Sequence, residues 1–261
     1  MQGKSTALNI YEADTPGVSA IAAVGFLHEA ITATVSRRPT PYLSAAVRRA
    51  FSWRYAVLKR TMDILLASIL IVLFFPVMLV VALAVALTSP GPIFFSQERL
   101  GRFGAPFRII KFRSMYTRKH KDNVFEINGH RRSDEDRRNE AAYPLNKDAP
   151  DPRITPVGRI IRKLSLDELP QLFNVLLGDM SLVGPRPIVE AEVSLYGQHF
   201  AYYDLFRPGI TGLWQVSGRS DVGFERRVLF DRDYASKWSC LLDFKILTQT
   251  IPAVVTMRGA Y

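Results

Sequence analysis

The feature that most constrains the fold is an uncharged apolar run over residues 64–87. As a helix, this run is long enough to cross the hydrocarbon core of a bilayer, which is about 30 Å thick. A buried core helix is the alternative interpretation, and the length of the run argues against it. We therefore predict a membrane protein with one membrane helix.

Two further observations bear on how this helix meets the membrane. Pro76 lies in the middle of the run and removes a backbone hydrogen bond, so a kink is expected there. The run is flanked on both sides by basic residues: Arg48, Arg49, Arg54, Lys59 and Arg60 before it, and Arg99, Arg102, Arg108, Lys111 and Arg113 after it. Because basic flanks favour the cytoplasmic face, we predict a re-entrant, proline-broken helix that enters and leaves by the same face.

The rest of the chain divides around this helix. Residues 1–42 show little pattern and are predicted to be a flexible N-terminal tail. Residues 43–88 are predicted to hold an amphipathic basic helix, which either suits a membrane surface or packs on the domain, followed by the membrane helix. Residues 89–261 are predicted to form a compact cytosolic domain. Within it, residues 117–150 are densely charged with both signs and are predicted to be a polar mobile insertion.

The cytosolic domain is predicted to be α+β and mostly helical. Apolar residues at helical spacing predict helices over 157–164, 169–177, 189–196, 224–234 and 241–251. Two short apolar and basic segments, 93–95 and 107–113, flank a glycine-containing turn and predict a short antiparallel hairpin.

Composition narrows the classes of partner and site. The net charge of +10 indicates anionic lipid headgroups, phosphorylated substrates or nucleic acid. The single cysteine, Cys240, excludes an internal disulfide framework and suits a reducing compartment. The four histidines show no ligand spacing, so a metal site of Cys and His is not expected.

The strongest chemical signal lies within residues 163–187. Asp167 and Glu168 are adjacent carboxylates at the start of a short apolar helix, and Arg186 follows in a stiff Pro-Arg-Pro turn. This combination suits the binding of phosphate and metal. The helix is predicted to bury one side, formed by Leu169, Leu172, Phe173, Leu176 and Leu177.

The carboxylates also have a purely structural interpretation. Ser165 and Glu168 fit a capping box. Alternatively, Asp167 is the N-cap, a register that keeps Pro170 within the first turn, where its missing N–H matters little. From this pair alone, capping is the better interpretation, and the neighbouring motifs change that balance.

Several motifs occur in an order that identifies a family. They are Lys59-Arg60-x-x-Asp63 before the membrane run, then Lys111-Phe112-Arg113-Ser114-Met115, Leu164-Ser165-Leu166-Asp167-Glu168-Leu169-Pro170-Gln171-Leu172, Val183-Gly184-Pro185-Arg186-Pro187 and Arg207-Pro208-Gly209-Ile210-Thr211-Gly212. From Lys59 to the C-terminus the sequence resembles the bacterial sugar transferases, the monotopic polyprenyl-phosphate hexose-1-phosphate transferases. It is most similar to the small exopolysaccharide-initiating members, the undecaprenyl-phosphate galactose phosphotransferases.

The resemblance implies a reaction and a location. Hexose-1-phosphate is expected to pass from a UDP-sugar to undecaprenyl phosphate with release of UMP, in a reaction that requires Mg²⁺. UDP-galactose is the first expectation for the donor and UDP-glucose the second. The expected place is the bacterial inner membrane, in contact with its lipids and with the catalytic domain facing the cytoplasm. Nucleic acid is not an expected partner, and a homo-oligomer is left open.

The resemblance also implies roles for single residues. Asp167 would be the nucleophile and Glu168 its metal-binding partner. Arg162 and Arg186 would hold phosphate oxygens. Pro76 would break the membrane helix, although Phe75 stands before it where many relatives have a serine. Four further basic residues are expected to contact phosphate or substrate: Lys111, Arg113, Arg207 and Arg219.

Two other functions remain open from the residues. A membrane-anchored glycosyltransferase would move only the sugar and release UDP. A basic adaptor without catalytic activity would explain the charge and the anchor, but gives no reason for a carboxylate pair beside two arginines.

Overall fold

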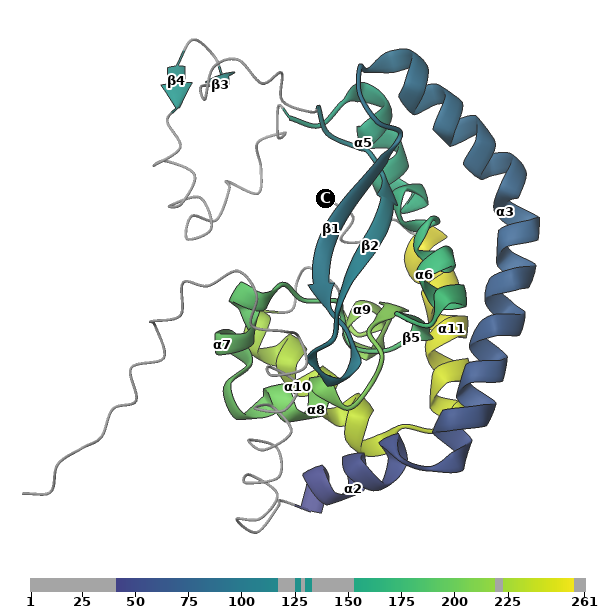
Figure 1. The fold of residues 1–261 in the computed structure, drawn as a ribbon, viewed down its shortest axis with the longest axis vertical. Coiled ribbons are helices and arrows are strands. Elements are labelled where there is room, and N and C mark those ends of the chain that lie inside the picture. The colour runs from purple at the N-terminus through teal and green to yellow at the C-terminus, as the bar shows by residue number, and fades with distance from the viewer. Residues whose placement is uncertain (1–40, 117–124, 128–129, 133–152, 219–222, 256–261) are drawn as a thin grey trace, which may run out of the picture.

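The computed structural model describes residues 41–116, 125–127, 130–132, 153–218 and 223–255 (Figure 1). The predicted tail therefore lies outside the described residues, except for its last two. The predicted insertion at 117–150 is described only at two short strands, β3 (Phe125–Ile127) and β4 (His130–Arg132), which pair antiparallel.

A long helix, α3 (Arg60–Thr88), runs along one edge of the domain (Figure 1). It follows α2 (Pro41–Ala50) and a π-helical turn, η1 (Arg54–Lys59). In the part of the chain that the structure describes, the helix from Arg54 to Thr88 is the one long and apolar enough to cross a membrane. Most of its apolar side chains are exposed, so the alternative of a buried core helix is wrong.

α3 packs against the domain near its two ends and not in its middle. Ala67 lies in the main hydrophobic core, and Val81 and Val85 lie in a second cluster with residues of the hairpin and of α5. Between these contacts, residues 72–77 are exposed apart from one half-buried side chain. Pro76 lies in this middle section and α3 continues on both sides of it, so a break at Pro76 stays a prediction.

The predicted hairpin is confirmed. β1 (Phe94–Leu100) pairs antiparallel with β2 (Pro106–Phe112), and β1 extends further than the predicted strand. Apolar side chains of β2, among them Phe107, Ile109 and Phe112, are buried. The described chain is mostly helical with three small two-stranded sheets, as the predicted class requires.

The predicted helices at 157–164 and 169–177 form, but the buried face of the second was predicted wrongly. α5 (Pro156–Lys163) is followed by a 3₁₀ turn, η3 (Leu166–Glu168), and by α6 (Gln171–Leu177). Phe173 and Leu177 are exposed, by 39% and 72%.

The reason for this difference is a polar residue at the centre of α6. Asn174 is buried because its side chain accepts a hydrogen bond from Ile110 N at 3.0 Å and donates one to Arg108 O at 2.8 Å, both in β2. With Asn174 and Val175 facing inward, the helical period turns Phe173 and Leu177 to the opposite side.

A parallel strand pair that the sequence did not predict lies next to α6. β5 (Ser181–Val183) pairs with β6 (Gly209–Thr211). The backbone at Gly184, directly after β5, passes close to Gly209. A Cβ atom on Gly209 would stand 2.1 Å from Gly184 N, which no side chain could tolerate. This close approach fixes where the Pro-Arg-Pro turn leaves β5.

The remaining helices enclose the core on the side of β5. They are α7 (Val193–Tyr196), α8 (Phe200–Asp204), α9 (Leu213–Val216), α10 (Phe224–Lys237) and α11 (Cys240–Val255). The last two confirm the helices predicted at 224–234 and 241–251. The helix predicted at 189–196 is instead a 3₁₀ turn, η4 (Glu190–Glu192), followed by the single turn α7.

A fully buried ion network ties the start of α3 to this core. Lys59 Nζ lies 2.9 Å from Asp63 Oδ1 and 3.0 Å from Asp243 Oδ2. Asp243 also accepts hydrogen bonds from Tyr234 OH and Trp238 Nε1, at 2.9 and 3.1 Å. Asp63 accepts a further bond from the backbone N–H of Leu182 in β5 at 3.2 Å, so α3, α10, α11 and β5 meet at one group of charges.

Candidate active site

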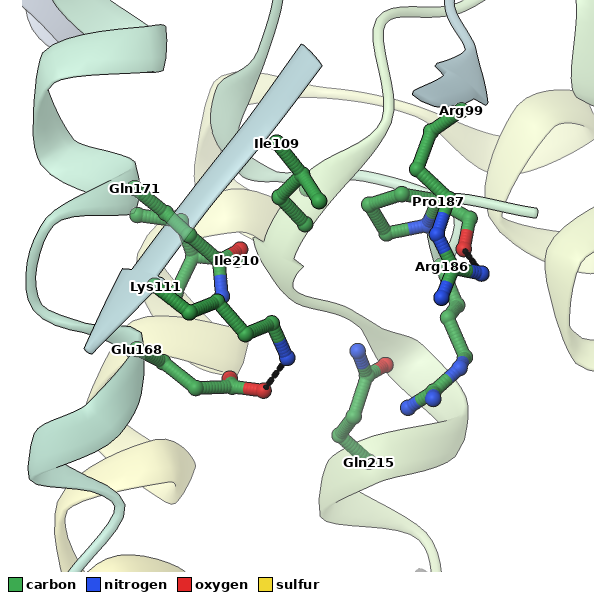
Figure 2. Close-up of a pocket in the computed structure, with 10 residues that line it drawn as sticks. Arg99, Ile109, Lys111, Glu168, Gln171, Arg186, Pro187, Ile210 and Gln215 are labelled. Carbon is green, nitrogen blue, oxygen red and sulfur yellow. Dashed lines mark hydrogen bonds and ion pairs between the residues drawn. The ribbon is translucent and has the colours of Figure 1, made fainter. Parts of the chain in front are cut away.

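A pocket opens between the hairpin, the start of α6 and the turn that follows β5 (Figure 2). It is lined by Arg99, Ile109, Lys111, Glu168, Gln171, Arg186, Pro187, Gly209, Ile210 and Gln215. Segments more than a hundred residues apart in the sequence therefore meet around one cavity.

The turn between α5 and α6 presents the carboxylate pair. Ser165 adopts a left-handed conformation with φ of 55°, which ends α5 and starts η3. No side-chain cap bond is present at the start of η3 or of α6, whose N-cap residue is Pro170. Both capping interpretations of Asp167 and Glu168 are therefore wrong, and the pair is available for another role.

Glu168 lines the pocket and is paired with Lys111 from β2. Lys111 Nζ lies 2.6 Å from Glu168 Oε1, as the dashed line in Figure 2 marks. Burial raises the pKa of Glu168, but the charge and hydrogen bond of Lys111, helped by the charge of Arg186, outweigh burial and hold this pKa below its usual value. Glu168 is therefore ionised at neutral pH.

Asp167 stands one residue before Glu168 and differs from it electrostatically. Burial raises the pKa of Asp167 to about 6, and the charge of Glu168 adds to this effect. Lys111 and Arg162, one turn back in α5, oppose the rise. Two adjacent carboxylates thus have unequal proton affinities, a difference that is common in active sites.

Arg186 faces Glu168 from the other side of the pocket (Figure 2). Its guanidinium carbon lies 5.7 Å from the ring centroid of Trp214, within the range of a cation–π contact. Arg186 therefore carries its charge into the pocket while an aromatic ring supports its side chain.

The other predicted phosphate-binding residues lie elsewhere. Arg113 is buried and donates to the carbonyls of Pro90, Ser89 and Val85, so it satisfies carbonyl groups at the C-terminal end of α3. Arg207 donates from Nε to the carbonyl of Gly178 at 2.8 Å. Neither lines the pocket, and Arg219 lies outside the described residues.

Residues to which the sequence assigned no role also lie at the pocket or contact its lining: Arg99 and Gln215 line it, and Trp214 contacts Arg186. Trp214 and Gln215 follow within three residues of the motif that ends at Gly212, so a weak signal existed for them. Arg99 was marked only as part of the basic flank of the membrane helix. Nothing in the local sequence of α10 indicated that Arg227 reaches Trp214, with its guanidinium carbon 4.7 Å from the ring centroid.

The donor atoms at the carboxylate pair fit magnesium. In the described ranges, no three His, Cys, Asp or Glu side chains are grouped so as to hold a metal ion by themselves. Asp167 and Glu168 are hard oxygen donors, and Mg²⁺ is usually bound by one or two carboxylates together with substrate phosphates. The pair therefore suits an ion that is shared between the protein and a phosphorylated substrate.

Comparison with known proteins identifies the family. The model of the family described as bacterial sugar transferase matches residues 54–257. The chain is 44% identical to the exopolysaccharide production protein ExoY of Rhizobium meliloti (strain 1021) over 205 residues, which cover 78% of this chain and 88% of the relative. It is 45% identical over 204 residues to the undecaprenyl-phosphate galactose phosphotransferase of Salmonella typhimurium (strain LT2), covering 78% of this chain and 42% of that protein.

A third relative adds another sugar. The UDP-glucose:undecaprenyl-phosphate glucose-1-phosphate transferase of Caulobacter vibrioides is 42% identical over 211 residues, which cover 78% of this chain and 72% of the relative. The motifs at the pocket, the family match over most of the chain and these relatives agree. The chain is an enzyme of the bacterial sugar transferase family.

Proposed function

We propose that this enzyme transfers hexose-1-phosphate from a UDP-hexose to undecaprenyl phosphate and releases UMP, as the membrane step that initiates an exopolysaccharide. The observation that carries the proposal is the pair Asp167 and Glu168 beside a pocket that also presents Lys111 and Arg186. The names of the relatives, which include both exopolysaccharide production and undecaprenyl-phosphate transfer, support it.

The chemistry requires cations around an anionic nucleophile. A carboxylate oxygen of Asp167 attacks the phosphorus that bears the sugar, and the bond from this phosphorus to the bridging oxygen breaks, so UMP leaves. Arg162 and Arg186 bind phosphate oxygens through their planar forks and reduce the repulsion between the anions. An oxygen of the lipid phosphate then attacks the same phosphorus and displaces Asp167.

Magnesium is part of the proposal. Glu168, with Asp167 beside it, would hold Mg²⁺, which supplies further neutralisation of the phosphate charge when bound. Lys111 keeps Glu168 ionised and oriented, because it pairs with one oxygen of the carboxylate and lowers its pKa. The roles of Glu168 as metal ligand and of Asp167 as nucleophile follow from the residue types and the family motif together.

We also propose that α3 is re-entrant at the cytoplasmic face of the bacterial inner membrane. A straight helix of this length would span about 44 Å and separate its two ends by a whole bilayer core. Both ends of α3 pack on the same domain, which favours entry and exit by one face. Phe51 and Trp53 are exposed next to Arg54 at the start of the helix, as suits a membrane interface.

The donor is proposed to be UDP-galactose, with UDP-glucose as the second candidate. The relative named for galactose transfer is slightly more similar to this chain than the relative named for glucose transfer. Because this difference is small, the donor has to be decided by a substrate panel.

The test is nucleotide release from the purified, detergent-solubilised protein with Mg²⁺, undecaprenyl phosphate and a panel of UDP-sugars. The expected product is UMP, and its release should depend on the lipid phosphate and on Mg²⁺. Asp167→Asn should abolish it. Asp233→Asn is the matched control, because Asp233 lies outside the pocket lining and pairs with Arg232 and Lys237. Release of UDP would identify sugar transfer alone, and no release from folded protein would favour the adaptor.

A further inference from the structure

Arginines from three separate elements gather on one side of the pocket: Arg99 and Arg186 line it opposite Glu168, and Arg227 joins them through the ring of Trp214. Arg99 comes from β1, Arg186 from the Pro-Arg-Pro turn and Arg227 from α10. Figure 2 shows Arg99 and Arg186 together, across the cavity from Lys111 and Glu168. The Trp214 ring lies 5.7 Å from the guanidinium carbon of Arg186 and 4.7 Å from that of Arg227, so it supports both side chains.

These cations are close enough to influence one another. The pKa of Arg99 and that of Arg227 lie below the usual arginine value, first because both side chains are partly buried and second because of the charge of Arg186. Arg99 Nη1 lies 3.8 Å from Glu192 Oε2. Arg186 forms no ion pair with any residue that the structure describes. Like charges gathered in a partly buried site are unfavourable unless an anion joins them.

Buried polar atoms beside the cluster also lack partners. Arg99 Nε and Trp214 Nε1 are donors, and Gln215 Oε1 is an acceptor; each is buried without a hydrogen bond to any described residue. Buried polar groups are nearly always hydrogen-bonded in native proteins, and two of these three residues, Arg99 and Gln215, line the pocket, so their unpaired atoms indicate a ligand there. The oxygens of a bound phosphate would accept hydrogen bonds from the two donors, Arg99 Nε and Trp214 Nε1.

We propose that Arg99, Arg186 and Arg227, arranged about Trp214, form the subsite for the nucleotide phosphate that leaves in the reaction. The inference rests on the proposed function and assigns residues to its leaving group. When the bond between the sugar-bearing phosphorus and the bridging oxygen breaks, the electron pair remains on that oxygen. UMP thereby gains negative charge at its phosphate, and the three arginines stabilise this charge on the side of the pocket opposite Glu168.

The position of the cluster favours the nucleotide over the lipid phosphate. α3 packs against α5 and α6, the helices on either side of Asp167 and Glu168. α10, which carries Arg227, packs against α2, α8 and α9 and lies farther from α3 than α6 does (Figure 1). A lipid acceptor approaches from the side of α3, whereas a water-soluble nucleotide is free to leave on the other side.

The experiment is equilibrium binding of UMP and of uridine to the purified, detergent-solubilised protein without lipid acceptor. Arg227→Gln and Arg99→Gln should each weaken UMP binding at least tenfold and leave uridine binding within twofold, because only the phosphate contact is lost. The matched control is Arg226→Gln, one residue earlier in α10 and exposed, which should leave both affinities within twofold.

Two measurements guard the conclusion against misfolding. Each variant must keep the melting temperature of the unmodified protein within a few degrees, and Arg227→Lys, which keeps the charge but loses the planar fork, should bind UMP with intermediate affinity. UMP affinity that is unchanged in both glutamine variants, or no stronger than uridine affinity in the unmodified protein, overturns the inference.

The binding assay tests the subsite and the turnover assay tests the proposed reaction, so either proposal can be refuted while the other stands. If turnover releases UMP but the affinity for UMP is the same in the Arg99→Gln and Arg227→Gln variants, the proposed reaction stands and the subsite is wrong. If UMP binds through these arginines while turnover releases no UMP, the nucleotide subsite stands and the phosphosugar chemistry is wrong.

Discussion

Removing the cation from the buried network at the start of α3 should destabilise the whole domain. Lys59 is 1% exposed and contacts Asp63 and Asp243 at 2.9 and 3.0 Å. Lys59→Met keeps most of the side-chain volume and leaves two buried carboxylates without their cation. Breaking a buried ion pair in this way costs about 3–5 kcal/mol. The bonds that Tyr234 and Trp238 donate to Asp243 remain, so the lower half of this range is expected.

The assay is thermal unfolding of the detergent-solubilised protein, followed by the loss of monodisperse protein on heating. For a domain of this size, each kcal/mol shifts the melting temperature by about 2–4 °C, so a cost of about 3–4 kcal/mol should lower that of Lys59→Met by roughly 6–16 °C. Lys237→Met is the matched control: this lysine also pairs with an aspartate four residues away, at 3.2 Å, but its side chain is 64% exposed. Its loss should cost about 0–1 kcal/mol.

A double variant separates the ion network from simple packing. Adding Asp243→Asn to Lys59→Met removes one of the uncompensated charges, so the double variant should lose less stability than the two single variants together, by about 1–3 kcal/mol. The reasoning is refuted if Lys59→Met melts within about 2 °C of the unmodified protein, or if the two substitutions are additive.

Three further predictions follow from single contacts. Burial raises the pKa of Asp231 to about 7, above its unfolded value near 4. Ionisation of Asp231 therefore destabilises the fold as pH rises from about 4 to about 7. Asp231→Asn should raise the melting temperature at pH 8 and leave it unchanged at pH 4. Lys111→Met removes the partner of Glu168 and should lower kcat for UMP release about 10²-fold, whereas Arg108→Met, at an exposed position of the same strand, should not. Asn174→Ala leaves two backbone groups of β2 unpaired, so unfolding should require about 1–3 kcal/mol less, measurable as a lower melting temperature.

Local patterns in the sequence determined the elements of the fold. The apolar run at 64–87 is long and uncharged, and it forms a helix whose side chains are mostly exposed. Such a helix suits a membrane, where exposed apolar side chains contact lipid and not water. The hairpin and the helices at 224–234 and 241–251 formed where hydrophobic periodicity predicted them. The carboxylate pair was found as a motif because Asp167 and Glu168 are neighbours in the sequence. These features depend on residues within a few positions of one another.

The orientation of short elements was not determined locally. Phe173 and Leu177 fit an apolar stripe as well as their neighbours do, yet both face outward. What decides the rotation of α6 is the pairing of Asn174 with two backbone groups of β2, more than 60 residues away. A hydrophobic pattern ranks residues by polarity, and it cannot represent a buried amide whose partners lie on another element.

Tertiary structure alone decided which basic residues share the pocket. The sequence offered Arg113 and Arg207 on the same footing as Lys111, but backbone carbonyls bind the first two. The parallel contact between β5 and β6 carries the Pro-Arg-Pro turn toward β1, β2 and α9. A guanidinium group is satisfied equally well by a carbonyl, an aromatic face or a phosphate. The sequence therefore determined that this chain is rich in arginine, and the packing of distant segments decided what each arginine can bind.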